Sequence, residues 1–154
     1  MKTYDFARLQ ARPFPTVADL KNPYIFGKTG VVINVSEREW PSPLRELFPR
    51  QGWQLFWYPL YETGLDMGLE NILECVRILE KADAEGIPAI VHCDFGNNRS
   101  RVVAEAFHFR KMGYHLEDPY KGAKNHLLYN CSIGLLPTAD VVESLLVAMR
   151  ESRA

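Results

Sequence analysis

The residues best suited to chemistry are a cysteine and an arginine six positions apart, Cys93 and Arg99, in the segment VHCDFGNNRS at residues 91–100. An apolar strand pattern runs into Cys93, a loop with Gly96 at its middle follows, and Arg99 opens an expected helix. Such a turn aims backbone N–H groups and a helix N-terminus at one point, which makes an anion-binding site. The same field would stabilise a nucleophilic Cys93 thiolate, and the guanidinium would bind two phosphate oxygens at once.

The string HCDFGNNRS resembles the His-Cys-x5-Arg-Ser/Thr signature of the cysteine-dependent protein tyrosine phosphatases. The chain length and the order of expected elements resemble the compact dual-specificity branch of that family. The resemblance implies that Cys93 is the nucleophile, that Arg99 holds the phosphate and that Ser100 assists the thiolate as a leaving group. It also implies that His92 braces the loop and tunes the thiol rather than taking a proton from substrate. The expected phosphate-binding segment comprises Asp94, Phe95, Gly96, Asn97, Asn98 and Arg99.

The family resemblance further implies a carboxylic acid that protonates the leaving group, on a loop about thirty residues before the cysteine and often three residues after a proline. Glu62 is the third residue after Pro59 and lies 31 residues before Cys93, but the family's usual acid is aspartate. Asp66 has the usual residue type and lies four residues later, where we expect the first turn of a helix. The helix dipole favours an acidic residue there without any catalytic role. We favour Glu62 as the acid and keep Asp66 as the alternative.

The loop also bears on the substrate class. It contains no lysine, and Asp94 places a negative charge near the rim, which disfavours polyanionic substrates by like-charge repulsion. The expected partner is therefore a phosphorylated protein or a small aryl phosphate, carrying phosphotyrosine or also phosphoserine or phosphothreonine. The expected reaction is metal-independent and cofactor-free hydrolysis through a phosphocysteine on Cys93.

Two other functions fit part of the pattern. One is a pseudophosphatase, which keeps the anion site as a phosphate-binding module but turns over poorly because its acid is displaced. The other is sulfur transfer, because rhodanese-like domains also carry a cysteine in a similar turn. His92 before the cysteine and the Arg99-Ser100 pair after the loop argue against sulfur transfer.

The remaining histidines and cysteines carry weaker signals. His108, His115 and His126 show no metal-ligand spacing, so we expect no metal site. Cys75 and Cys131 are expected to fill core or half-buried positions. Three cysteines are an odd and sparse set, which argues against a disulfide framework and for a reducing compartment.

The elements that must position the site alternate between strand and helix patterns, which indicates an α/β fold. We expect a central, mostly parallel sheet of four to five strands flanked by helices, as in the dual-specificity phosphatases. Strands are expected at 31–35, 54–58 and 87–92, and helices from Leu65 to a stop at Glu85-Gly86, from residue 98 or 99 to Met112-Gly113, and after Pro137. The first thirty residues are expected to be irregular, with a small edge strand near Tyr4 to Phe6, and residues 117–137 show no clear periodicity.

The length and charge of the chain limit the number of domains and the classes of binding partner. The chain has 154 residues, of which 47% are hydrophobic, so residues 1–154 fit a single domain. It carries 18 Lys and Arg against 19 Asp and Glu, a net charge of −1, without the basic excess typical of nucleic-acid or membrane binding. With no signal-peptide or membrane-span pattern, we expect a cytoplasmic monomer that binds neither nucleic acid nor membrane.

Overall fold

The structure is a computed structural model, and it describes residues 2–4, 9–22, 30–60, 69–94 and 99–112. In chain order the elements are β1 (Lys2–Tyr4), β2 (Leu9–Arg12), α1 (Val17–Leu20), β3 (Val31–Asn34), α2 (Ser42–Arg50), β4 (Gln54–Trp57), α3 (Leu69–Ala84), β5 (Ala89–His92) and α4 (Arg99–Met112). No helix in the described ranges is both long and apolar enough to cross a membrane.

The strands form one five-stranded sheet in the order β1-β2-β5-β3-β4. The strands β2, β5, β3 and β4 run parallel, and β1 joins the edge antiparallel to β2. The register places Asn34 opposite both His92 and Trp57, so β3, β5 and β4 all end at the same edge of the sheet. The predicted fold class is therefore confirmed, and Cys93 follows directly at the edge where ligands bind in such sheets.

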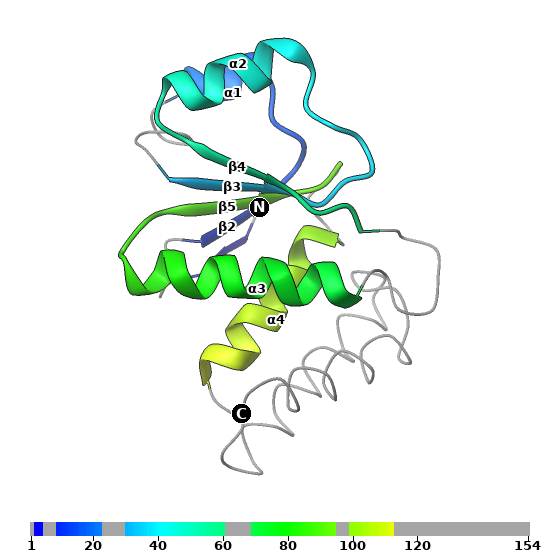
Figure 1. Cartoon of the computed structure of the whole chain (residues 1–154), viewed down its shortest axis with the longest axis vertical. Coiled ribbons are helices and arrows are strands. Elements are labelled where there is room, and N and C mark those ends of the chain that lie inside the picture. The colour runs from blue at the N-terminus through cyan, green and yellow to red at the C-terminus, as the bar shows by residue number, and fades with distance from the viewer. Residues whose placement is uncertain (1, 5–8, 23–29, 61–68, 95–98, 113–154) are drawn as a thin grey trace.

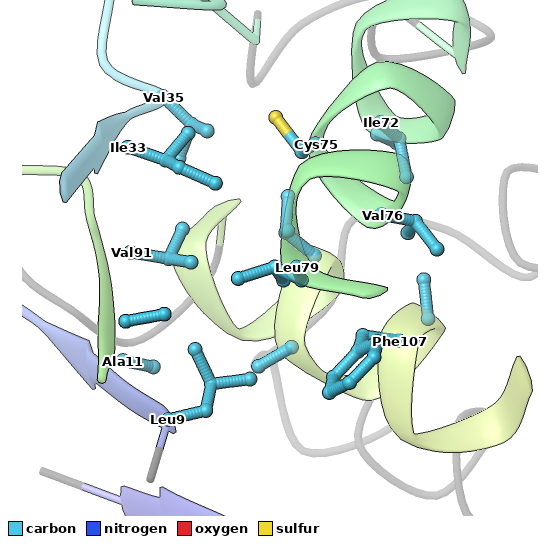
Figure 2. Packing of buried hydrophobic residues seen from close by; sticks show 14 of the residues in the cluster. Leu9, Ala11, Ile33, Val35, Ile72, Cys75, Val76, Leu79, Val91 and Phe107 are labelled. Atoms are coloured by element: carbon cyan, nitrogen blue, oxygen red, sulfur yellow. The ribbon is translucent and has the colours of Figure 1, made fainter. Parts of the chain in front are cut away.

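Helices cover both faces of the sheet, with α1 and α2 on one side and α3 and α4 on the other (Figure 1). Because successive strand residues point to opposite faces, Val32 and Ile90 pack toward α1 and α2. The residues that follow them along β3 and β5, Ile33 and Val91, pack toward α3 and α4. Figure 2 shows this second core, in which strand residues meet the apolar stripes of the two helices. Its labelled residues are Leu9, Ala11, Ile33, Val35, Ile72, Cys75, Val76, Leu79, Val91 and Phe107.

The two helices nearest the site begin and end as their sequences indicate. Helix α3 ends before Gly86, which adopts a left-handed φ of 68°, a conformation that glycine takes without strain. Helix α4 begins at Arg99, as predicted. The predicted start of the preceding helix at Leu65 lies outside the described residues, as do the 117–137 segment and the helix expected after Pro137.

The N-terminal region departs from the sequence expectation. The expectation of irregular structure in the first thirty residues is wrong, because β2 lies inside the sheet between β1 and β5, and α1 follows it. The small edge strand exists but spans Lys2–Tyr4. Helix α1 begins with a capping box in which Thr16 and Asp19 each accept from the other's backbone N–H. Helix α2, which the sequence analysis did not predict, adds Leu44 and Phe48 to the core.

Candidate active site

Cys93 follows β5 and is 2% exposed, on the face of the sheet that packs against α4. Its backbone N–H donates to Arg12 O at 3.3 Å, which extends the contact between β2 and β5 by one residue. The Cys93 thiol donates to Ser100 Oγ, 3.3 Å away in the first turn of α4. Ser100 is fully buried. The strand end and the helix start therefore bring a thiol and a hydroxyl together, and the hydroxyl becomes the donor once the thiol ionises.

Arg99 is the first residue of α4, and its side chain is only 5% exposed. Its Nη1 donates to Leu60 O at 3.2 Å, and its Nη2 donates to Asp94 Oδ2 at 2.9 Å. Leu60 is itself fixed, because its N–H donates to Val35 O at 3.0 Å. A buried guanidinium requires such acceptors, because its desolvation is otherwise costly. The cation is therefore held between the chain after β4 and the residue after the cysteine.

His92 is fully buried and points to the opposite face from Cys93. The indole Nε1 of Trp40 donates to His92 Nε2 at 2.9 Å. Because an indole N–H can only donate, Nε2 must be the unprotonated nitrogen, and the ring carries its proton on Nδ1. Burial lowers the pKa of His92 to about 3, against a smaller opposing contribution from the backbone of Cys93. His92 is therefore a neutral brace whose ring also meets Phe14 edge-on, with centroids 4.8 Å apart.

The Asp94 carboxylate lies between two arginines. Besides Arg99, its Oδ1 lies 3.4 Å from Nη2 of Arg38, whose side chain is 59% exposed. The Arg38 guanidinium is stacked over the ring of Phe14, 3.7 Å from the centroid, and Phe14 N–H donates to Asp94 O at 3.1 Å. The rim charge expected from the sequence is therefore present but is compensated by two cations.

The loop that presents Arg38 is fixed by buried polar residues at the end of β3. Asn34 Nδ2 donates to Arg38 O at 2.8 Å, and Asn34 Oδ1 accepts from the N–H of Ser36 at 2.9 Å. The Ser36 hydroxyl lies 2.7 Å from Asn34 Oδ1 and 2.8 Å from Arg38 O, and both Asn34 and Ser36 are fully buried. Trp57 Nε1 closes the network by donating to Ser36 O at 2.9 Å. The backbone of Arg38 is thus anchored while its guanidinium remains accessible.

The structure describes five of the predicted site residues. It brings Cys93 to Ser100 and Asp94 to Arg99, and it places His92 against Trp40 instead. The other predicted positions lie outside the described residues, namely Glu62, Asp66, Phe95, Gly96, Asn97 and Asn98. Cys75 lies on α3 and is buried in the core, as expected, and burial raises the pKa of its thiol. Among the residues that the structure describes, no group of three or more His, Cys, Asp or Glu is placed to hold a metal ion.

Sequence reasoning missed Arg38, Trp40 and the carbonyl of Leu60. All three follow the carboxyl ends of β3, which pairs with β5, or of β4, which lies on the far side of β3. Ligand sites of parallel sheets are built from the segments at that edge. The signal for these residues was the parallel arrangement itself, which brings the segments after β3 and β4 to the same edge of the sheet as the end of β5.

Comparison with known proteins identifies the fold. No family profile matches the sequence, and no curated protein matches it significantly. Solved structures do match: PTPMT1 in complex with PI(5)P has a TM-score of 0.69 and 15% identity, with 92% of each chain covered. TpbA from P. aeruginosa has a TM-score of 0.61 and 18% identity, covering 94% of this chain and 87% of TpbA. The core catalytic domain of the PP-IP phosphatase SIW14 from S. cerevisiae has a TM-score of 0.58 and 11% identity, covering 80% of this chain and 73% of its own. The chain therefore has the fold of the cysteine-based, protein-tyrosine-phosphatase-like proteins, as its signature segment indicated.

Proposed function

We propose that the chain hydrolyses phosphate monoesters in two steps through a phosphocysteine on Cys93, with neither metal nor cofactor. The observation that carries this proposal is the juxtaposition at the carboxyl edge of the sheet. There the Cys93 thiol lies 3.3 Å from the Ser100 hydroxyl, and the buried Arg99 precedes Ser100 as the first residue of α4. The shared fold with cysteine-based phosphatases supports the same function.

In the first step Arg99 and the helix N-terminus hold the substrate phosphate, because both present N–H donors to an anion. The Cys93 thiolate attacks phosphorus, the S–P bond forms and the P–O bond to the leaving group breaks. The leaving oxygen takes its proton from a carboxylic acid, for which Glu62 is our first candidate and Asp66 the alternative. Such a proton transfer contributes about 10²–10⁴ in rate.

In the second step water attacks the phosphorus of phosphocysteine while the carboxylate formed in the first step accepts a proton from that water. The P–S bond breaks and sulfur leaves as the thiolate. The Ser100 hydroxyl, fully buried at 3.3 Å from Sγ, donates to the departing sulfur and stabilises its charge. His92 is neutral and bonded to Trp40, so it holds the strand end in place and takes no part in proton transfer.

The proposed substrates are phosphotyrosine in proteins or small aryl phosphates, with phosphoserine and phosphothreonine open to the same chemistry. TpbA has been solved in complex with pTyr, whereas PTPMT1 has been solved with PI(5)P and SIW14 is named a PP-IP phosphatase. The Asp94 carboxylate beside Arg99 favours the monophosphorylated class for this chain. We further propose that the chain acts as a monomer. We also propose that it works in a reducing compartment such as the cytoplasm, because the mechanism needs a free thiol.

The test is hydrolysis of an aryl phosphate by the purified chain at about pH 6, in the range where general acids of this kind act. Cys93→Ser should abolish turnover, and Cys75→Ala, which changes a buried cysteine of the core, should retain it. Unchanged activity in Cys93→Ser would refute the mechanism. Comparison of Glu62→Gln with Asp66→Asn identifies the acid. Tungstate binding without any hydrolysis would instead favour a phosphate-binding pseudophosphatase.

A further inference from the structure

One carboxylate in the site is shared unequally between two cations. Asp94 binds Arg99 at 2.9 Å and approaches Arg38 at 3.4 Å, and the two arginine side chains are 5% and 59% exposed. The electrostatic interaction is stronger for the buried partner, because solvent and salt screen the exposed one. In the absence of substrate, Asp94 is therefore held chiefly by Arg99, whose buried charge it balances.

The substrate phosphate needs the same guanidinium. A phosphate dianion at Arg99 would lie beside the Asp94 carboxylate, which is bonded to Nη2 of that arginine, and the two anions repel each other. The carboxylate has an alternative partner close at hand, because its other oxygen already lies 3.4 Å from Arg38. Arg38 is in turn stacked on Phe14, and its backbone carbonyl accepts from Asn34.

We propose that Asp94 is a specificity-determining residue that occupies Arg99 as an internal anion and passes to Arg38 when phosphate binds. The exchange moves the carboxylate toward solvent without leaving it unpaired. It also leaves a negative charge at the rim beside the bound phosphate. A substrate with a second anionic group next to the scissile phosphate therefore meets additional repulsion from this carboxylate, which a monophosphate does not.

The exchange is tested by measuring the dissociation constant of tungstate by titration calorimetry, which requires no turnover. Asp94→Asn keeps the side-chain shape and an acceptor for Arg99 but removes the competing charge. We expect it to bind tungstate about tenfold more tightly, because the anion then displaces the weaker hydrogen bond of a neutral amide instead of that of a carboxylate, and meets no carboxylate charge. Arg38→Ala should bind tungstate several-fold more weakly, because the displaced carboxylate loses its partner.

The double variant separates exchange from direct contact. If Arg38 acts only through Asp94, Arg38→Ala has no further effect in the Asp94→Asn background. If Arg38 bound the anion itself, the loss would be equal in both backgrounds, and that result would overturn the exchange. Glu39→Gln and Arg45→Ala are matched controls, because they remove the same charges from a neighbouring exposed ion pair, 3.4 Å long. Both should leave tungstate affinity unchanged.

The specificity part of the proposal rests on the proposed function and is measured separately. The ratio of kcat/KM for an aryl monophosphate to that for an aryl bisphosphate with adjacent phosphates should fall several-fold in Asp94→Asn. Weaker or equal tungstate binding by Asp94→Asn, with its thermal stability unchanged, would refute the exchange and assign Asp94 to orienting Arg99. Tungstate binding without hydrolysis by the unaltered chain would refute the proposed function and leave the exchange standing.

Discussion

The hydrogen bond from Trp40 to His92 offers a test of how the site is braced. Trp40→Phe keeps an aromatic ring in the cluster but removes the only group seen to donate to His92 Nε2 within the described ranges. Both side chains are buried, at 4% and 0% exposure, so water cannot replace the donor without entering the core. An acceptor left unpaired in such a place costs about 1–3 kcal/mol.

The smaller ring adds a second contribution. Trp40 packs edge-on against Phe48 with ring centroids 6.1 Å apart, and replacing indole by phenyl leaves a void in this cluster that costs about 1 kcal/mol more. The total of about 3 kcal/mol corresponds to a Tm lower by roughly 6–12 °C for a domain of this size. Phe48→Leu is the matched control, because it opens a void in the same cluster and retains the indole donor.

The assay combines thermal unfolding with long-range ¹⁵N correlation spectra of the His92 ring. We expect a single tautomer protonated at Nδ1 in the unaltered chain and in Phe48→Leu, and a mixture in Trp40→Phe because nothing then requires Nε2 to accept. If Trp40→Phe kept the Nδ1 tautomer and unfolded at the same temperature as Phe48→Leu, the hydrogen bond would not be what fixes the ring.

Three further predictions follow from single contacts. Ser100→Ala removes the donor to the leaving sulfur, so a burst of product should precede a steady state slowed about tenfold or more, as seen in stopped-flow traces. Burial lowers the pKa of His92 from 6.5 to about 3, so between these values the unfolded chain binds a proton that the folded chain does not. The free energy of unfolding should therefore be unaffected above pH 6.5 and fall by up to about 1.4 kcal/mol per pH unit toward pH 3. Urea titrations of His92→Asn should show a flatter slope over this range. Gly30→Ala places a Cβ 2.4 Å from Pro88 O and should lower the free energy of unfolding by about 1–3 kcal/mol. An unchanged free energy of unfolding in urea titrations would contradict the packing argument.

The part of the site that the sequence predicted is the part built from neighbours along the chain. Cys93 and Ser100 are seven residues apart, and the strand before them and the helix after them fix their approach. Arg38 and Trp40 reach Asp94 and His92 across 56 and 52 residues. Their residue types are common on surfaces and in cores, so only the strand order, which a single sequence does not reveal, brings them to the cysteine.

The same distinction applies to the fold. Strands β3 and β5 are buried along their whole length and read as continuous apolar runs, so the sequence located both to within two residues. Strand β2 has only two buried positions, Leu9 and Ala11, alternating with polar residues over four positions, too short a pattern to detect. Helix α2 has nine residues with Pro49 inside, and a proline there argues against a helix unless tertiary packing supports it.

The charge balance of the chain follows from where its cations lie. A net charge of −1 provides no general attraction for anions, so the proposed recognition of phosphate depends on the local electric field at the site. Arg99 provides that field because it is buried, where a unit charge interacts more strongly than at the surface. The same burial makes an unbalanced Arg99 costly, and Asp94 balances it in the free protein. A carboxylate with one negative charge can balance the arginine and still give way to a phosphate with two, provided that a second cation accepts it. In the exchange proposed above Arg38 is this second cation, 3.4 Å from the carboxylate, so two arginines would let a nearly neutral chain balance its buried charge and still favour a doubly charged ligand.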